Sequence, residues 1–208
     1  MSAQREATLA PQFMGDLSHL EPHGHGSRSL TWWGMMGLIA IETTAFVLAG
    51  VTYLYLANQS PRWPPDEIAP SLLWGTLFTI VTLVSFLPNM WVKRVSEEEK
   101  LRPVRIGLIV MCLFGVALLV IRYYEFTALH VAWSDSAYGS IVVTLLALHT
   151  VHLATDFIDS VVLAVLMFTR HGRGRRFVDC AENAIYWNFV VFGWLPFYAL
   201  LYWAPRWL

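Results

Sequence analysis

The chain has 208 residues, of which 56% are hydrophobic and 14% are charged, and its formal net charge is −1. This composition excludes a soluble globular domain and predicts an all-α, polytopic membrane protein. A net charge this close to zero, with the basic residues in short clusters between apolar runs, also excludes a nucleic-acid partner.

The first 30 residues are polar and show no hydrophobic periodicity, which predicts a flexible cytoplasmic tail. Its three clustered histidines, His19, His23 and His25, are explained more simply by a solvated tail than by a metal site. The first apolar run follows this tail without a signal-peptide cleavage pattern, so we expect no cleaved leader. Residues 31–208 are predicted to form one membrane domain of five helices.

Two spans are predicted in the first half of the chain. The first covers residues 32–56, begins with a pair of tryptophans at the headgroup level, and is long enough to cross a bilayer. Residues 58–70 contain four prolines and are predicted to form a loop. The second span covers residues 71–92, and the charged segment Lys93–Arg105 is predicted as the loop that follows it.

The third span is predicted at residues 104–127 and carries Arg122 and Glu125 one turn apart near its end. We expect Arg122 either to snorkel to the headgroups or to pair with Glu125. The fifth span is predicted at residues 183–203, after a basic loop. Acidic side chains favour a helix N-terminus, so Asp179 and Glu182 are expected just before this span.

The fourth span, residues 138–168, contains the most informative pattern in the chain. At about 100° per residue, five polar side chains fall within an arc of roughly 80° on a helix. These are Tyr138, His149, His152, Asp156 and Asp159. An ionisable side chain in hydrocarbon costs about 2.5 kcal/mol or more, so this stripe is predicted to face protein. The apolar residues expected on other faces of the helix are Ile141, Val142, Leu146, Leu153 and Val161.

An odd number of spans places the two termini on opposite sides of the membrane. Eleven of the fourteen Lys and Arg residues fall on the side of the N-terminus and two on the other, which predicts a cytoplasmic N-terminus and a periplasmic C-terminus. The eleven are Arg5, Arg28, Lys93, Arg94, Lys100, Arg102, Arg105, Arg170, Arg173, Arg175 and Arg176, and the two are Arg62 and Arg206.

Two histidines inside one apolar span are candidate ligands for a haem or a metal ion. A bis-histidine haem needs ligands on opposite faces of the iron, whereas His149 and His152 lie one turn apart on one helix. A metal held by these two residues and Asp156 is geometrically possible, but buried metals normally draw ligands from more than one element. Hydrogen bonding between helices is the simplest interpretation, so we predict no catalytic, cofactor-binding or metal-binding residue.

Glu42 is the other conspicuous polar residue. It lies about 15 Å along the first helix from Trp32, which places it near the middle of the bilayer. An unpaired carboxyl at this depth is costly. We therefore expect Glu42 to share a hydrogen bond, directly or through water, with His149 or His152.

Segments on all five spans resemble, in order and in register, subunit III of the haem–copper terminal oxidases in its short, five-helix form. The segments are Trp33–Gly34, Ile41–Thr43, Ile121–Phe126, Tyr138–Ser140, Leu148–Leu153 and Glu182–Trp194. Within the resemblance, Glu42 matches the family's intramembrane glutamate, and His149 and His152 match its paired histidines. The chain departs from the family pattern at Thr150, Asn188, Val191 and Arg122.

The resemblance implies a subunit without redox centres in a cytochrome c oxidase of a bacterial-type inner membrane. Such a subunit packs on subunit I, with subunit II in the same complex, binds structural phospholipid, and supports proton uptake and the durability of the complex. Haem and copper are then expected in the partner subunits. The implied polar network comprises Glu42, Arg122, Glu125, Tyr138, His149, His152, Asp156, Asp159 and Glu182.

Other functions remain open at this point. One is a stand-alone polytopic transporter or assembly factor that uses the same polar stripe as a pathway. A transporter is expected to show paired halves or broken helices, and neither is evident in the sequence. Another is an accessory protein of a quinol oxidase or a nitric-oxide reductase.

Overall fold

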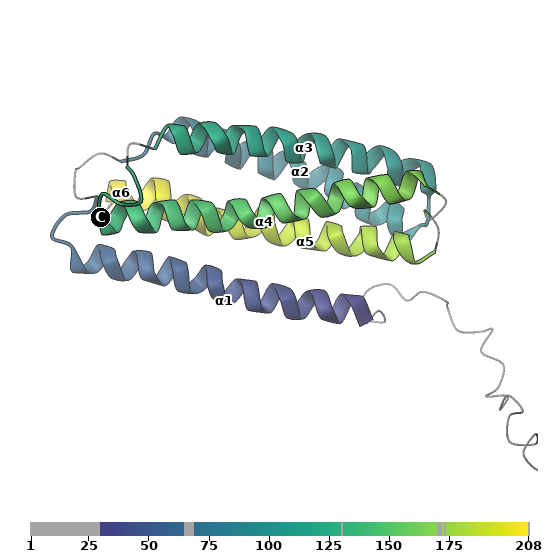
Figure 1. Cartoon of the computed structure of the whole chain (residues 1–208), viewed down its shortest axis with the longest axis horizontal. Coiled ribbons are helices and arrows are strands. Elements are labelled where there is room, and N and C mark those ends of the chain that lie inside the picture. Colours follow the sequence, from purple (N-terminus) through teal and green to yellow (C-terminus); the bar gives the residue numbers. More distant parts are fainter. Residues whose placement is uncertain (1–29, 65–68, 130, 170–171, 173, 208) are drawn as a thin grey trace, which may run out of the picture.

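The computed structural model describes residues 30–64, 69–129, 131–169, 172 and 174–207 and is helical throughout its regular structure. Five of its helices are long and apolar enough to cross a membrane, as predicted (Figure 1). They are α1 (Leu30–Gln59), α2 (Leu72–Glu97), α3 (Leu101–Thr127), α4 (Ala137–Phe168) and α5 (Arg175–Tyr198), which continues through a π-helical turn (Ala199–Trp203) into α6 (Ala204–Trp207). The predicted tail, with its three histidines, lies outside the described residues.

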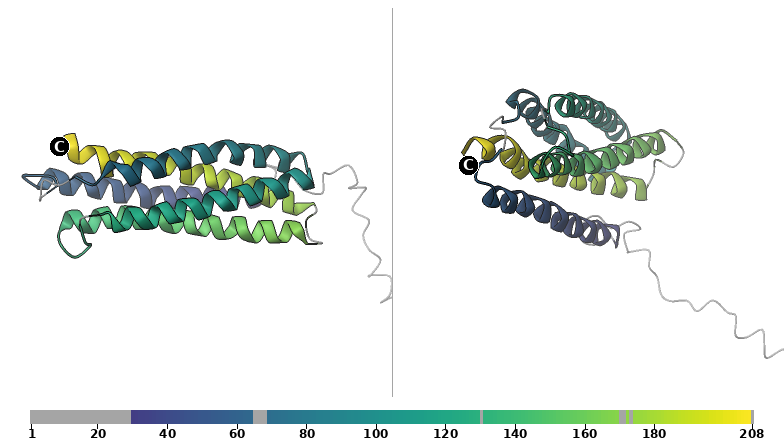
Figure 2. Two further views of the ribbon diagram at one scale, coloured as in Figure 1. Left: turned by 90° about the horizontal axis from the view of Figure 1, so that it is seen from above. Right: turned by 60° about the vertical axis from the view of Figure 1, so that its left-hand side comes forward.

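Helices α2 to α5 form a closed bundle in which each helix packs against two of the others. The contacts run from α2 to α3, from α3 to α4, from α4 to α5 and from α5 back to α2. Helix α1 lies outside this ring and packs against α4 and α5 (Figures 1 and 2). Helix α4 therefore contacts three helices, α1, α3 and α5.

Glycines allow the helices of the bundle to approach one another closely. A side chain at Gly75 would overlap the ring of Tyr202, one at Gly107 would overlap Val92, and one at Gly115 would overlap Phe157. Lipid is as apolar as a leucine side chain, so helices in a membrane associate through this kind of van der Waals packing.

Hydrogen bonds between side chains join α5 to α2 inside the bundle. The indole of Trp187 donates to Ser85 at 2.9 Å, and the indole of Trp194 donates to Thr79 at 2.8 Å. Because both tryptophans are buried, each N–H needs such a partner. The two bonds fix the rotation of α5, and with it the direction in which its other side chains point.

The segment Lys93–Arg105, predicted as a loop, is mostly helical. Helix α2 continues to Glu97 and α3 begins at Leu101. The extension of α2 carries ion pairs one turn apart, Lys93 with Glu97 at 3.0 Å and Arg94 with Glu98 at 3.2 Å, which support a helix in water. Glu98 lies just beyond the end of α2. Hydrogen bonds from Lys100 and Arg94 lower the pKa of its carboxyl. The change from apolar to charged residues therefore does not coincide with the end of the helix.

The helix that contains the predicted fifth span begins at Arg175, before the predicted start of the span near residue 183. Asp179 and Glu182 therefore lie inside the helix and do not precede it. Arg176 and Asp179 form an ion pair of 2.8 Å one turn apart, which supports this polar first part of α5. Near the other end of α5, Pro196 lacks a backbone N–H, and a π-helical turn follows it.

The orientation of the bundle stays a prediction with a direct test. Helix α1 begins at one end of the bundle and α6 ends at the other (Figure 1). We expect a topology reporter fused after Leu208 to be active in the periplasm, and one inserted between Arg170 and Arg176 to be active in the cytoplasm. Reversed activities of the two fusions would contradict the orientation derived from the basic residues.

Candidate functional site

Four of the five residues in the predicted stripe on α4 are buried. Tyr138, His149 and Asp156 are at most 1% exposed, and His152 is 9% exposed. Asp159 differs, because it is exposed and lines a groove at the surface. The stripe therefore faces protein along most of the helix and opens to the outside at one end.

The apolar residues of α4 are not turned away from the protein as a set. Ile141, Val142, Leu146 and Leu153 are all buried, and only Val161 is exposed. Burial on α4 is therefore not limited to the polar stripe. The reason is that α4 packs against α1, α3 and α5 and is covered on more than one side.

Arg122 is the centre of a buried polar cluster that joins α2, α3, α4 and α5. Its Nη1 donates to Glu125 at 2.8 Å and its Nη2 to Nδ1 of His149 at 3.0 Å. The guanidinium carbon lies 3.7 Å from the ring centroid of Phe78 and 4.2 Å from that of Trp194. The cluster combines an ion pair with two cation–π contacts.

The partners of His149 determine its protonation state. Its Nε2 lies 3.0 Å from the carbonyl oxygen of Val190, which can only accept a hydrogen bond. Nε2 therefore carries the hydrogen, and Nδ1 accepts from the Arg122 guanidinium, which can only donate. His149 is thus a neutral imidazole held at both nitrogens.

Of the two arrangements expected for Arg122, the structure has the pairing with Glu125 and not the snorkelling to headgroups. Arg122 is 1% exposed and Glu125 is 2% exposed. The second carboxylate oxygen of Glu125 accepts a hydrogen bond from the hydroxyl of Tyr202. Sequence analysis did not identify Tyr202, since the residue lies far along the chain from Glu125 and only the fold brings them together.

Glu42 has polar partners but not the hydrogen bond that we expected. The hydroxyl of Tyr186 donates to its Oε2 at 2.8 Å, whereas Nε2 of His152 lies 3.6 Å from its Oε1. His149 is not a partner, because both of its nitrogens are engaged elsewhere. Of the two histidines, His152 is therefore the one beside Glu42, at ion-pair distance, and Tyr186 is the residue that the sequence analysis missed.

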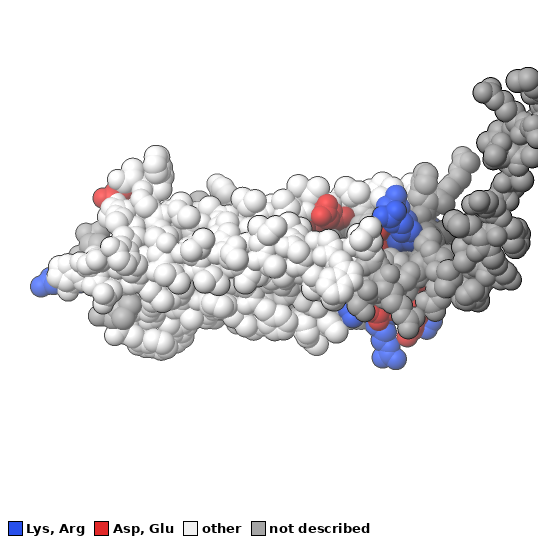
Figure 3. Space-filling view, turned by 90° about the horizontal axis from the view of Figure 1, so that it is seen from below, with Lys and Arg blue, Asp and Glu red and all other residues white. Residues whose placement is uncertain are grey.

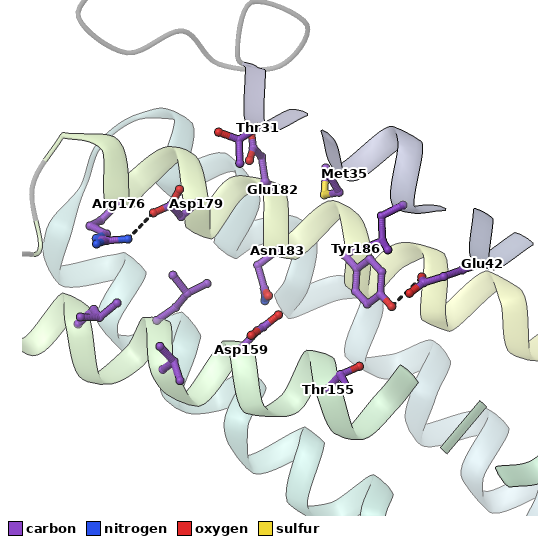
Figure 4. Close-up of a pocket in the computed structure, with 14 residues that line it drawn as sticks. Thr31, Met35, Glu42, Thr155, Asp159, Arg176, Asp179, Glu182, Asn183 and Tyr186 are labelled. Carbon is purple, nitrogen blue, oxygen red and sulfur yellow. Dashed lines mark hydrogen bonds and ion pairs between the residues drawn. The ribbon is translucent and has the colours of Figure 1, made fainter. Parts of the chain in front are cut away.

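An open groove of about 530 Å³ lies between α1, α4 and the first part of α5. Its lining residues include Glu42, Asp159, Glu182 and Tyr186, as Figure 4 shows. Apolar side chains from α1 and α4 also line it, and the ion pair of Arg176 with Asp179 lies at one end. In the space-filling view, charged side chains gather towards one end of a largely uncharged face (Figure 3).

Asp156 lies beside the groove residues but is 0% exposed. Among the described residues, neither of its carboxylate oxygens has a hydrogen-bond partner. It lies close enough to Asp159 and Glu42 to interact with both electrostatically. In the part of the chain that the structure describes, no group of three or more His, Cys, Asp or Glu side chains is placed to hold a metal ion.

Tyr138 belongs neither to the Arg122 cluster nor to the lining of the groove. It lies at the beginning of α4, where Trp63 packs edge-on against it at a centroid distance of 4.9 Å. Trp63 also packs edge-on against Tyr53 of α1 at 5.3 Å. Tyr138 therefore belongs to an aromatic contact that joins the loop after α1 to the start of α4.

Asn188, one of the departures from the family pattern, takes part in contacts between α5 and α2. Asn89 donates to its side-chain oxygen at 2.8 Å and to the carbonyl of Ala184 at 2.7 Å. The amide of Asn188 in turn donates to the sulfur of Met90 at 3.5 Å. Val191, another departure, is buried with 1% exposure and belongs to the apolar core.

The comparisons with known proteins cover nearly all of the described bundle. The model of the family "Cytochrome c oxidase subunit III" matches residues 29–206. A protein of Synechocystis sp. named "Cytochrome c oxidase subunit 3" is 25% identical over 190 residues, which cover 88% of this chain and 79% of that protein. The chain is therefore a membrane protein of the cytochrome c oxidase subunit III family and forms part of an oxidase complex.

Proposed function

We propose that this chain is the non-catalytic subunit III of a proton-pumping haem–copper oxygen reductase of the cytochrome c oxidase type. It packs against subunit I, with subunit II in the same complex, and the haem and copper reside in those partners. It supports proton uptake and the stability of the complex in a bacterial-type inner membrane. The observation that carries this proposal is a family match that extends over all five long helices.

The polar clusters support a structural role for this chain within the complex. Arg122 donates to both Glu125 and His149. Glu125 also accepts from Tyr202, and His149 also donates to the carbonyl oxygen of Val190. A guanidinium held by a carboxylate, an imidazole and two aromatic rings is well placed to join helices. This arrangement gives the subunit a rigid core against which a larger partner packs.

We further propose that the groove between α1, α4 and α5 holds a structural phospholipid. Met35, Leu38 and Leu166 provide an apolar wall, and Arg176 and Asp179 provide charges of both signs at one end. A phospholipid has the same distribution, with apolar chains and a headgroup that carries a phosphate. Such a lipid would fill the space beside the first half of α1.

The test of this function is whether haem proteins accompany the chain. We expect affinity-tagged chain, extracted from its native membrane in a mild detergent, to bring a haem–copper subunit with it, seen as a Soret band and identified by mass spectrometry. The same chain stripped of partners in a harsh detergent should show no Soret band. A tagged membrane protein of unrelated function is the control for non-specific capture.

Two outcomes would contradict the proposal. One is a stoichiometric haem spectrum on the stripped chain, because this would place the redox centre in the chain itself. The other is mild extraction that yields the folded chain without any haem–copper subunit, which would favour a function outside the complex.

A further inference from the structure

Helix α1 is anchored to the bundle along only part of its length. Its buried residues are Phe46, Gly50 and Tyr53, all in the second half of the helix. From Leu30 to Ile41 no residue is buried. This first part of α1, residues Leu30–Ile41, is called the arm below. Together with Glu42, three of its residues, Thr31, Met35 and Leu38, form the α1 side of the groove.

The anchor begins one turn after Glu42. The ring of Phe46 inserts between α4 and α5, with centroid distances of 4.6 Å to His152, 5.5 Å to Phe189 and 5.1 Å to Phe197. A large aromatic side chain packed on three sides holds its helix firmly in place. Motion of the arm therefore has a natural pivot near Phe46.

Glu42 lies at the junction between the arm and the anchored half, and it is the one charged residue of α1. Its carboxylate touches both helices on which α1 packs. Oε2 accepts from Tyr186 of α5 at 2.8 Å, and Oε1 lies 3.6 Å from Nε2 of His152 of α4. These side-chain polar contacts tie α1 to both helices.

The contact with His152 depends on a proton. Nδ1 of His152 lies 2.6 Å from the carbonyl oxygen of Leu148 and donates its hydrogen there. In the neutral imidazole, Nε2 then carries a lone pair that faces a carboxylate oxygen, and the two repel each other. A proton on either atom converts this repulsion into a hydrogen bond or an ion pair. The Tyr186 hydroxyl bonds to Glu42 in both states, so the proton controls the contact with α4.

Several titratable groups lie around Glu42. Tyr186 of α5 and His152 of α4 contact Glu42, and Asp156 of α4 is close enough to interact with it electrostatically. Asp159 of α4 and Glu182 of α5 line the same groove. Except for the histidine and the tyrosine, these groups are acids.

We propose that a single proton shared by Glu42 and His152 latches the arm of α1 against α4. While the proton is bound, the arm stays close to α4. When the proton leaves as the pH rises, the arm swings away from α4 about the anchor at Phe46, and the groove widens. Occupancy of the groove is thereby linked to pH. The latch concerns this chain alone and does not rest on the proposed function.

The test measures the position of the arm as a function of pH. Spin labels are placed at Gly37 in the arm, where a side chain meets no atom within 4 Å, and at Val165 of α4, which is 60% exposed. The native Cys112 and Cys180 are replaced by alanine, and the full chain is studied in lipid nanodiscs by double electron–electron resonance. We expect the distance between the labels to lengthen and its distribution to broaden as the pH rises, with one midpoint.

A second pair of labels, at Val51 of α1 and Thr144 of α4, serves as the control. Both positions are exposed. Val51 lies in the anchored half of α1, and Thr144 lies in the first part of α4. The distance between them should stay constant across the same pH range. A parallel change in both pairs would indicate general unfolding of α1 and would overturn the latch.

Two substitutions of Glu42 distinguish the effect of the proton from the effect of the size of the side chain. In Glu42→Gln, the amide N–H donates to Nε2 of the neutral His152 imidazole, and the amide oxygen still accepts from Tyr186, so the short distance should persist when the pH rises. In Glu42→Leu the arm pair should show the long distance at every pH. A pH-dependent shift that survives in Glu42→Gln, or a wild-type distance that never changes with pH, would refute the proposal. The Gln variant decides the question even if the Leu variant does not fold.

Discussion

Arg122→Met should be among the most destabilising single substitutions in this chain. The change removes one partner of a buried ion pair and leaves Glu125 as a charge without its cation, which costs about 3–5 kcal/mol in proteins. It also removes the donor to Nδ1 of His149 and two cation–π contacts. The free energy of unfolding, measured by titration of the detergent-solubilised chain with SDS, should fall by an amount in this range.

The double variant Arg122→Met/Glu125→Leu is the matched control. Replacement of a buried ion pair by apolar residues of similar volume is often neutral or even stabilising. The double variant should therefore recover most of the stability that the single variant loses. The single variant Glu125→Leu completes the comparison. If the double variant loses as much stability as the two single variants together, Arg122 and Glu125 do not act as an ion pair.

Gly75→Ala should give the second large effect. A Cβ at this position overlaps the ring of Tyr202, which is 2% exposed and has little room to move. Overpacking of this kind typically costs about 1–3 kcal/mol. Displacement of the ring would also break the hydrogen bond from Tyr202 to Glu125 and so disturb the Arg122 cluster.

Gly34→Ala is the control for the glycine substitution itself. No atom lies within 4 Å of a Cβ at that position. Alanine favours a helix over glycine by about 1 kcal/mol, so this variant should be as stable as the original chain or slightly more stable. In a Tyr202→Phe background, Gly75→Ala should cost less than it does alone, because the bond to Glu125 is already absent. An equal cost in both backgrounds would contradict the link between Gly75 and the cluster.

The existence of the five spans follows from the sequence because hydropathy is a local property. An apolar run of about 20 residues is long enough to cross the hydrocarbon layer whatever surrounds it. The end of α2 and the beginning of α5 were harder to predict than the existence of the spans. Helices α2 and α5 extend beyond the apolar runs as charged helix, with pairs such as Lys93–Glu97 and Arg176–Asp179, so a change in polarity did not coincide with a change in structure.

The polar residues of the site were also evident from the sequence, because ionisable groups inside apolar runs are costly and therefore conspicuous. The hydrogen-bond partners of these residues were not evident from the sequence. The expected hydrogen bond from Glu42 to a histidine is replaced by one from Tyr186, with His152 at 3.6 Å. Tyrosines in apolar runs are common at membrane interfaces, so nothing in the sequence distinguished Tyr186 or Tyr202 from the others.

The sequence by itself determined the class of the protein, the number of its helices and the positions along them that carry polar groups, because composition and helical periodicity depend only on neighbouring residues. Only the tertiary structure decided that His149 belongs with Arg122 and that His152 belongs with Glu42. These two histidines lie one turn apart on α4, yet they meet different helices, since α3 and α1 both pack against α4. Which side chains meet depends on the order and the rotation of the helices in the bundle, and packing across the whole molecule sets both.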